Sequence, residues 1–144
     1  MLEVKGITIH NTGDSLSAKV KCDQLVQMKR PNLCHYLVDE KEIIQTWPET
    51  EQAVHTGKGY DLGNTNTIAI EICRSTSSEN LYLKAQDKAV ELIKQLLAKY
   101  NLGLEDVYFH MDFNPNYRCP HRILDIYKTK QDFLREVFDL ERKD

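Results

Sequence analysis

The chain has 144 residues, a length that fits one domain with a single hydrophobic core. Hydrophobic residues make up 41% and charged residues 28%, with no long apolar run, so the composition excludes a protein inserted in a membrane. The formal net charge of -3 offers no basic field for a phosphate backbone and argues against generic nucleic-acid binding. The four cysteines are irregularly spaced, which predicts free thiols or ligands rather than a disulfide framework.

The first predicted element is a strand, Val4–Thr12, in which apolar and polar side chains alternate with period two up to Gly13. His10 therefore lies at the carboxyl end of this strand. The segment Met1–His10 lacks the basic flank and the apolar stretch of a secretory signal. We therefore expect synthesis in the cytoplasm.

A helix and a hairpin follow. Asp14 or Ser15 can cap a helix that runs to about Met28. Two strand-like runs, Cys34–Val38 and Glu42–Trp47, are separated by a short charged turn. This arrangement predicts a β-hairpin.

The second half of the chain contains clearer patterns. Thr56–Asn66 is rich in Gly and Asn and predicts a long surface loop. The next strand, Thr67–Cys73, places its three isoleucines on one face and Ala69, Glu71 and Cys73 on the other, and Glu71 is a charge in an otherwise buried pattern. Apolar residues at helical spacing predict a helix over Asn80–Tyr100, and a short strand, Asp106–His110, comes next.

The apolar pattern of Asp125–Arg142 predicts a last amphipathic helix. The order strand, helix, hairpin, strand, helix, strand, helix predicts an α/β domain, with a central mixed and partly parallel sheet flanked by helices. Ligands of such sheets bind outside the carboxyl ends of the strands. Since His10 and His110 both occupy such ends, we expect the two histidines at one rim of the sheet.

A catalytic zinc ion needs three protein ligands and one open position. His10, His110 and Cys119 meet this need if both histidines share the rim, because the loop after His110 can return the cysteine thiolate. A lone strand-end histidine is, however, more often a surface or hydrogen-bonded core residue. His121 and Asp112 compete for the same coordination role, and Asp112 can instead orient a histidine.

Five short blocks carry a resemblance to a known family. In chain order they are ITIHNT (7–12), CHY (34–36), VHTG (54–57), IAIEIC (68–73) and CPHRIL (119–124). Together they resemble the type-2 N-acetylmuramoyl-L-alanine amidases, which include phage and prophage endolysins and are related to the peptidoglycan recognition proteins. The resemblance implies one amidase catalytic domain over residues 1–144, with a motif-bearing core of about 4–126 and a C-terminal helix of about 127–142.

The resemblance also implies a reaction, a cofactor and a partner. The expected reaction is hydrolysis of the amide between N-acetylmuramic acid and L-alanine in bacterial peptidoglycan. One Zn²⁺ per chain is expected on His10, His110 and Cys119, with Glu71 as the general acid/base. Zinc would lower the pKa of a water toward ~7 and polarise the amide carbonyl. The competing interpretation of Glu71 is an ion pair with Arg74 or a nearby lysine.

Two positions depart from the family pattern. Some relatives use a tyrosine directly before the histidine of the second strand, and Cys34 stands there, which excludes that version and predicts a small core residue. Many relatives place a lysine two residues before the cysteine, where it stabilises the oxyanion. Tyr117 occupies that position, and we hypothesise that Arg118 supplies the charge.

Three further side chains are expected to bind substrate: His55, His35 and Trp47. The competing interpretations are an exposed loop histidine, simple strand packing and a core tryptophan. An alternative function is a non-catalytic peptidoglycan-binding or muropeptide-binding module of the same fold. The presence of Cys119 beside both histidines and Glu71 favours the enzyme, and a zinc hydrolase acting on another amide stays open.

The expected substrate lies outside the membrane. One expectation is a prophage lysin that is released through a membrane lesion. The other is one domain of a larger exported protein.

Overall fold

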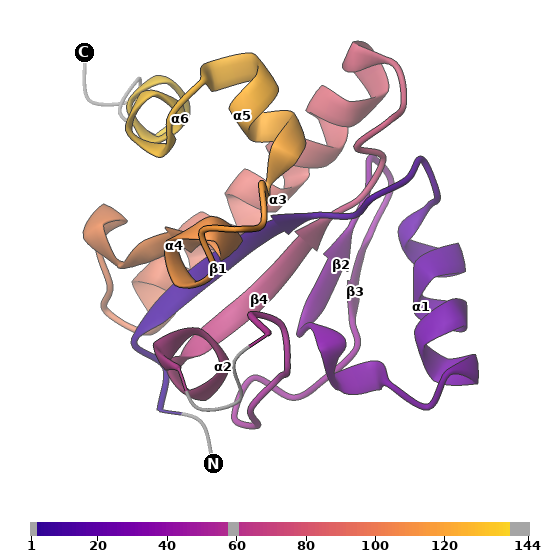
Figure 1. The fold of residues 1–144 in the computed structure, drawn as a ribbon, viewed down its shortest axis with the longest axis horizontal. Coiled ribbons are helices and arrows are strands. Elements are labelled where there is room, and N and C mark those ends of the chain that lie inside the picture. Colours follow the sequence, from indigo (N-terminus) through magenta and orange to yellow (C-terminus); the bar gives the residue numbers. More distant parts are fainter. Residues whose placement is uncertain (1–2, 58–60, 139–144) are drawn as a thin grey trace.

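A five-stranded sheet forms the centre of the computed structural model, which describes residues 3–57 and 61–138 (Figure 1). The strand order is β3-β2-β4-β1-β5. Four strands are parallel: β1 (Gly6–Asn11), β2 (Tyr36–Val38), β4 (Thr67–Ile72) and β5 (Val107–Phe109). The edge strand β3 (Ile43–Gln45) runs antiparallel to β2. The prediction of a mixed, partly parallel sheet flanked by helices is confirmed.

Helices connect and cover the strands. They are α1 (Ala18–Gln27), α2 (Leu62–Asn66), α3 (Glu79–Lys99), α4 (His110–Phe113), α5 (His121–Tyr127) and α6 (Lys130–Val137), with 3-10 turns at Pro31–Leu33 and Leu104–Asp106. In the part of the chain that the structure describes, none of them is both long enough and apolar enough to cross a membrane.

The larger core lies between the sheet and α3. The isoleucines of β1 and β4 point to this face and pack against a buried stripe of α3. Because side chains alternate along a strand, the polar residues of β1 point to the opposite face. Ser78 caps α3 by accepting a hydrogen bond from the Leu81 N–H. The helix predicted over Asn80–Tyr100 is therefore confirmed to within about one residue at each end.

The opposite face of the sheet carries a smaller core against α1. Its buried members are Ala18, Cys34, Leu37, Ala69 and Cys73. The prediction of a buried core role for Cys34 is confirmed, and all four cysteines are free thiols. This is the face on which His10 lies.

The single C-terminal helix predicted over Asp125–Arg142 is wrong. The chain forms α5 and α6 with a break at Lys128, whose φ of 73° lies in the left-handed region and ends α5. Thr129 then caps α6 by accepting a hydrogen bond from the Asp132 N–H. Residues 139–142 of the predicted helix lie outside the described residues.

Three smaller predictions also need correction. Ser17, rather than Asp14 or Ser15, caps α1, because its hydroxyl accepts the Val20 N–H. The predicted loop over 56–66 contains the short helix α2, which Asp61 caps by accepting the Asn64 N–H. His110 begins α4 instead of ending β5, so its side chain leaves from a helical turn directly after the strand.

Candidate metal centre and active site

The pairing of β1 with β4 brings His10 and Glu71 together. The two residues are directly opposite in the parallel register, and so their side chains share a face of the sheet. His10 Nδ1 lies 3.8 Å from Glu71 Oε2. The His10 residue is only 2% exposed, whereas the Glu71 side chain is 21% exposed. The charge that interrupts the buried pattern of β4 therefore reaches open space beside a histidine.

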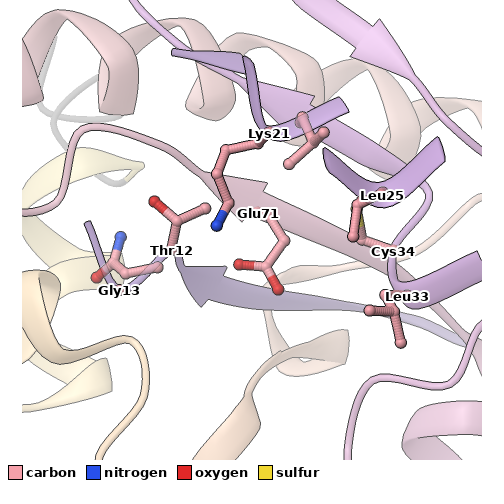
Figure 2. Close-up of a pocket in the computed structure, with 9 residues that line it drawn as sticks. Thr12, Gly13, Lys21, Leu25, Leu33, Cys34 and Glu71 are labelled. Carbon is pink, nitrogen blue, oxygen red and sulfur yellow. The ribbon is translucent and has the colours of Figure 1, made fainter. Parts of the chain in front are cut away.

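That space is a cavity of about 240 Å³ on the α1 face of the sheet. Figure 2 shows the Glu71 carboxylate and the Lys21 ammonium directed into it. Apolar side chains form part of the wall: Leu25, Leu33, Cys34 and Leu37. Burial raises the pKa of Glu71 to about 7, and the Lys21 cation opposes this shift. The carboxyl group thus changes protonation near neutral pH.

Arg74 is not the partner of Glu71. Its Nε donates to Glu40 Oε1 at 2.9 Å and its Nη2 to Glu40 Oε2 at 3.2 Å. The alternative in which Arg74 neutralises Glu71 is therefore wrong.

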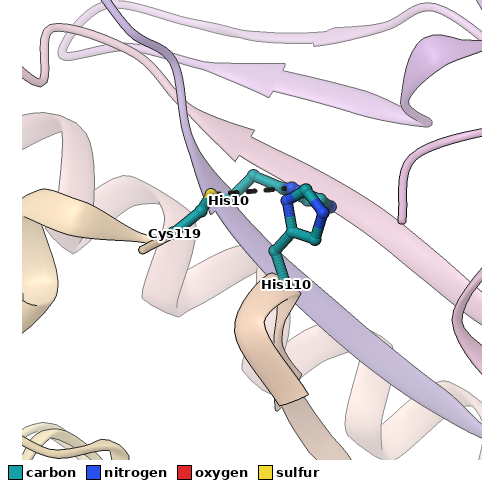
Figure 3. Close-up of side chains that lie close together, drawn as sticks. All are labelled: His10, His110 and Cys119. Carbon is teal, nitrogen blue, oxygen red and sulfur yellow. Dashed lines mark hydrogen bonds between the residues drawn. The ribbon is translucent and has the colours of Figure 1, made fainter. Parts of the chain in front are cut away.

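Two more candidate ligands converge on His10 (Figure 3). The His110 ring lies 4.7 Å from the His10 ring between centroids, and Cys119 Sγ lies 3.8 Å from His10 Nδ1. One potential ligand atom from each of the three residues lies within 4.8 Å of the others. Among the described residues, this is the group of His, Cys and acidic side chains with the spacing to hold a metal ion.

Hydrogen bonds hold the segment that carries Cys119 against α4 and the end of β1. The Met111 N–H donates to the Cys119 carbonyl at 3.1 Å. The Asn11 side-chain oxygen accepts the N–H groups of Arg122 and Ile123 at 2.9 and 3.3 Å. Asn11 directly follows His10, so the end of β1 positions one candidate ligand and also anchors the segment that carries another candidate, Cys119. The sequence pattern does not reveal this anchor, although Asn11 stands inside the block ITIHNT.

The chemistry of the cluster fits a metal ion. Burial, and then the nearby His55 and His110, lower the pKa of His10 well below its usual range, and burial also lowers the pKa of His110. Both rings are therefore neutral, the form that binds metals. His110 Nε2 is buried without a hydrogen-bond partner. Burial and the Glu71 carboxylate raise the pKa of the Cys119 thiol to about 12, so loss of its proton calls for a nearby cation.

The two competing ligands lie elsewhere. Asp112 accepts the Phe109 N–H at 2.8 Å and pairs with Lys130 at 2.7 Å, which makes it a cap of α4. It orients none of the three candidate ligands through these contacts. His121 begins α5 and is not part of the metal-binding group found among the described residues.

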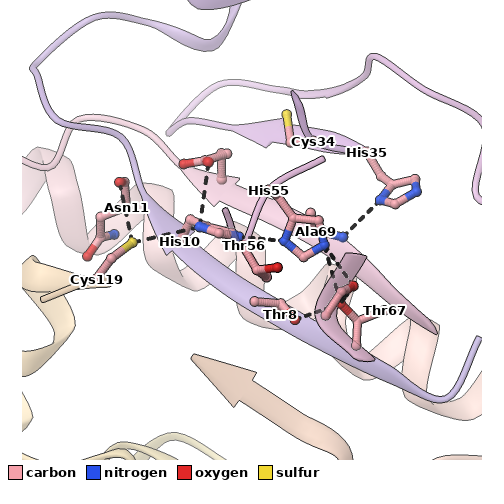
Figure 4. A network of polar contacts seen from close by, with 12 residues as sticks. Thr8, His10, Asn11, Cys34, His35, His55, Thr56, Thr67, Ala69 and Cys119 are labelled. Carbon is pink, nitrogen blue, oxygen red and sulfur yellow. Dashed lines mark hydrogen bonds and ion pairs between the residues drawn. The ribbon is translucent and has the colours of Figure 1, made fainter. Parts of the chain in front are cut away.

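Two of the three expected substrate-binding residues have no free ring nitrogen. His35 Nδ1 accepts the Ala69 N–H at 2.9 Å, and its Nε2 donates to the Glu51 carbonyl at 2.8 Å. His55 bonds through Nδ1 to His10 and through Nε2 to the Gly63 carbonyl (Figure 4). Both rings are buried. The structure thus corrects the substrate-binding expectation for both histidines, because their polar atoms are engaged inside the protein.

Trp47 and Arg118 lie away from the ligand cluster. Trp47 lines a separate hollow with Gln45, Thr46 and Pro48, and its indole donates to the Gln52 carbonyl at 3.0 Å. The Arg118 side chain is 57% exposed, and its Nη2 lies 2.7 Å from Asp125 Oδ1 on α5. Its other hydrogen bond goes to the His121 carbonyl. These contacts direct its charge toward α5 in this structure, so the oxyanion role of Arg118 stays a prediction.

Tyr117 occupies the position, two residues before Cys119, at which many relatives have a lysine. Its ring stacks on His110 with centroids 5.2 Å apart and an interplanar angle of 12°. The tyrosine is 57% exposed. It therefore covers one face of a candidate ligand at the protein surface.

The fold and the site together define an α/β domain with a candidate metal-dependent hydrolase centre. A family model described as N-acetylmuramoyl-L-alanine amidase matches residues 1–122. The chain belongs to this family.

Individual relatives agree with this assignment. The chain is 37% identical to N-acetylmuramoyl-L-alanine amidase CwlA of Bacillus subtilis (strain 168) over 124 residues, which cover 85% of the chain and 45% of CwlA. The structure of PlyL superposes with a TM-score of 0.85 at 31% identity, covering 93% of this chain and 84% of PlyL. AmiD from E. coli has been solved in complex with anhydro-N-acetylmuramic acid-L-Ala-D-gamma-Glu-L-Lys. It superposes with a TM-score of 0.60 at 25% identity, covering 78% of this chain and 50% of the AmiD chain. The chain thus spans less than half the length of the curated relative CwlA.

Proposed function

We propose that this chain is an amidase catalytic domain that hydrolyses the bond between N-acetylmuramic acid and L-alanine in bacterial peptidoglycan, with one zinc ion on His10, His110 and Cys119. The observation that carries the proposal is the placement of Glu71 beside this ligand group, 3.8 Å from His10 Nδ1, at the edge of a cavity. Membership of the amidase family supports the bond that is cleaved, and the ligand in the AmiD complex supports the substrate class.

In this mechanism the metal ligands and Glu71 have separate roles. A zinc ion bound there would polarise the scissile carbonyl and make water a better nucleophile at neutral pH. Glu71 takes the proton from the attacking water. It then delivers a proton to the alanine nitrogen as the carbon–nitrogen bond breaks, which yields a free lactyl carboxylate and a free alanine amine. A pKa of about 7 for Glu71 suits both transfers near neutral pH.

The cavity next to Glu71 is the proposed position of the stem peptide. Its apolar wall can receive the alanine methyl group, and Lys21 supplies a cation where the peptide carries carboxylates. Lys21 is already paired with Asp14 at 3.0 Å, so its charge is held in place at the cavity. Lys21 was not predictable as a cavity residue, because nothing in its local sequence pattern distinguishes it from other helix lysines.

The direct test is digestion of purified peptidoglycan by the zinc-loaded chain. The expected products are new alanine amino termini without new reducing sugar ends. Reducing ends alone would overturn the amidase proposal, and bound zinc without any cleavage would support the muropeptide-binding module instead. Removal of zinc by a chelator is expected to stop the digestion, and its return is expected to restore it.

Glu71→Gln separates catalysis from metal binding. This variant keeps the shape and hydrogen-bonding capacity of the side chain but cannot carry the proton. We expect turnover to fall by about 10²- to 10⁴-fold, while the zinc content stays that of the unmodified chain. Equal turnover in the variant would remove Glu71 from the mechanism.

The protein can reach peptidoglycan in two ways: release of this chain through a membrane lesion, or its presence within a larger exported protein. The second way is consistent with relatives that extend well beyond the matched segment.

A further inference from the structure

The His55 ring lies behind His10 and uses both of its nitrogens. His10 Nε2 lies 2.9 Å from His55 Nδ1, and His55 Nε2 lies 2.9 Å from the Gly63 carbonyl oxygen. The two rings meet edge to face at 79° (Figure 4). His55 is 8% exposed. Both histidines are therefore fixed in a chain of hydrogen bonds that begins at a backbone carbonyl.

The direction of donation in these two hydrogen bonds can be assigned. A carbonyl oxygen only accepts, so His55 Nε2 must carry the hydrogen. A buried neutral imidazole has one N–H, which leaves His55 Nδ1 bare and able to accept from His10 Nε2. The single hydrogen of a neutral His10 is then on Nε2. Its bare Nδ1 faces Cys119 Sγ and Glu71 Oε2, each at 3.8 Å.

We propose that His55 is a positioning residue that selects the His10 tautomer with a bare Nδ1 and holds that nitrogen toward the metal site. Metal-binding histidines generally fix their orientation through the second ring nitrogen, and here another imidazole passes the constraint to the backbone. The inference rests on the proposed function, since it takes His10 as a metal ligand.

The short helix α2 serves to hold this arrangement. Asn64 Oδ1 accepts the N–H groups of His55 and Thr56 at 2.7 and 3.0 Å, which fixes the backbone that carries the ring. Thr67 donates to the Gly63 carbonyl at 2.7 Å. A Cβ at Gly63 would lie 2.4 Å from Thr56 Cγ2, so only glycine permits this approach of the carbonyl.

The test compares two substitutions of His55. His55→Phe fills the space of the ring but accepts no hydrogen bond, whereas His55→Asn retains an acceptor near the position of Nδ1. Zinc affinity is measured by competition with a chromogenic chelator. We expect affinity to fall by about 10- to 100-fold in His55→Phe and to recover in His55→Asn. His35→Phe is the matched control, because it removes another buried, doubly bonded imidazole that does not contact His10, and it should leave zinc affinity unchanged.

A second measurement does not depend on how the variants fold. Long-range proton–nitrogen correlation spectra of the isotope-labelled, metal-free chain report which His10 nitrogen carries the hydrogen. A hydrogen on Nε2 is expected, and a hydrogen on Nδ1 would overturn the inference, as would unchanged zinc affinity in His55→Phe. Failure of the unmodified chain to bind zinc would instead count against the proposed function, while the spectra would still decide the tautomer.

Discussion

The candidate site is assembled from two regions that are built differently. The strand side consists of His10 and Glu71, which stand opposite each other on β1 and β4. The loop side consists of His110 and Cys119, which lie on α4 and in the segment before α5. Backbone pairing of two buried strands places the first pair, whereas a few hydrogen bonds from a partly exposed segment place the second. The strand side is therefore the more rigid half, and the loop side depends on its anchors.

The largest expected effect comes from removing the cysteine of the loop side. Cys119→Ala should abolish zinc binding and lower turnover by on the order of 10³-fold or more, since a metal ion contributes several kcal/mol of transition-state stabilisation. The fold should survive, because Cys119 is outside both hydrophobic cores. Metal analysis, far-UV circular dichroism and wall digestion measure these outcomes.

Cys22→Ala provides the matched control. Cys22 is also a half-buried free cysteine, but it lies on α1 outside the ligand group. Equal loss of zinc in both variants would contradict the assignment of Cys119.

The next effect concerns the anchor between the two sides. Asn11→Ala removes the acceptor for two backbone N–H groups, and the loss should cost about 1–3 kcal/mol of unfolding free energy. Zinc affinity should fall as well, because the released segment carries Cys119. Urea unfolding of the metal-free chain and zinc titration measure the two quantities.

Asn11 also donates to the Tyr82 hydroxyl at 3.1 Å, and Tyr82→Phe removes only that bond. We expect this second variant to keep its zinc affinity. If it loses as much affinity as Asn11→Ala, the bond to tyrosine rather than the anchor is responsible.

A smaller, pH-dependent effect is expected next to the strand side. The Arg74 side chain, through its hydrogen bond, holds the pKa of Glu40 below its ordinary value of 4.5. A depressed carboxyl pKa stabilises the fold above the unfolded value, and this stability is lost as the pH falls through the folded value. Glu40→Gln should therefore cost about 1 kcal/mol at neutral pH, and the difference from the unmodified chain should vanish as the pH falls through the lowered pKa of Glu40. Urea unfolding at a series of pH values checks this, and a difference that persists in acid would show that packing, not charge, is responsible.

The comparison also explains which features the sequence could predict. The strand side was predictable, because period-two alternation identifies β1 and β4 and marks Glu71 as a charge out of place. The stripe of α3 was equally clear. The break at Lys128 was not, because it lies in one left-handed backbone conformation and the apolar pattern continues across it.

The substrate-binding prediction for His35 and His55 did not anticipate how their ring nitrogens are bonded, and the reason is physical. His35 and His55 satisfy their ring nitrogens mainly with backbone groups, the Ala69 N–H and the carbonyls of Glu51 and Gly63. Backbone partners leave no trace in residue identity, so the sequence cannot distinguish such a histidine from one that faces a substrate. The candidate ligands of the loop side were named by the resemblance, since spacing alone allowed His121 and Asp112 as well.

The smallest expected effect lies at the outer edge of the loop side. Arg118→Ala removes an exposed ion pair with Asp125, and such pairs contribute about 0–1 kcal/mol to stability. Turnover on peptidoglycan should stay unchanged, because the guanidinium is held on α5 rather than at the ligands. Asp125→Ala is the control, since it frees Arg118 without removing its charge and should also leave turnover unchanged. A fall in turnover in Arg118→Ala alone, measured by alanine amino termini released, would show that the arginine leaves Asp125 when substrate binds and would restore its charge to the reaction.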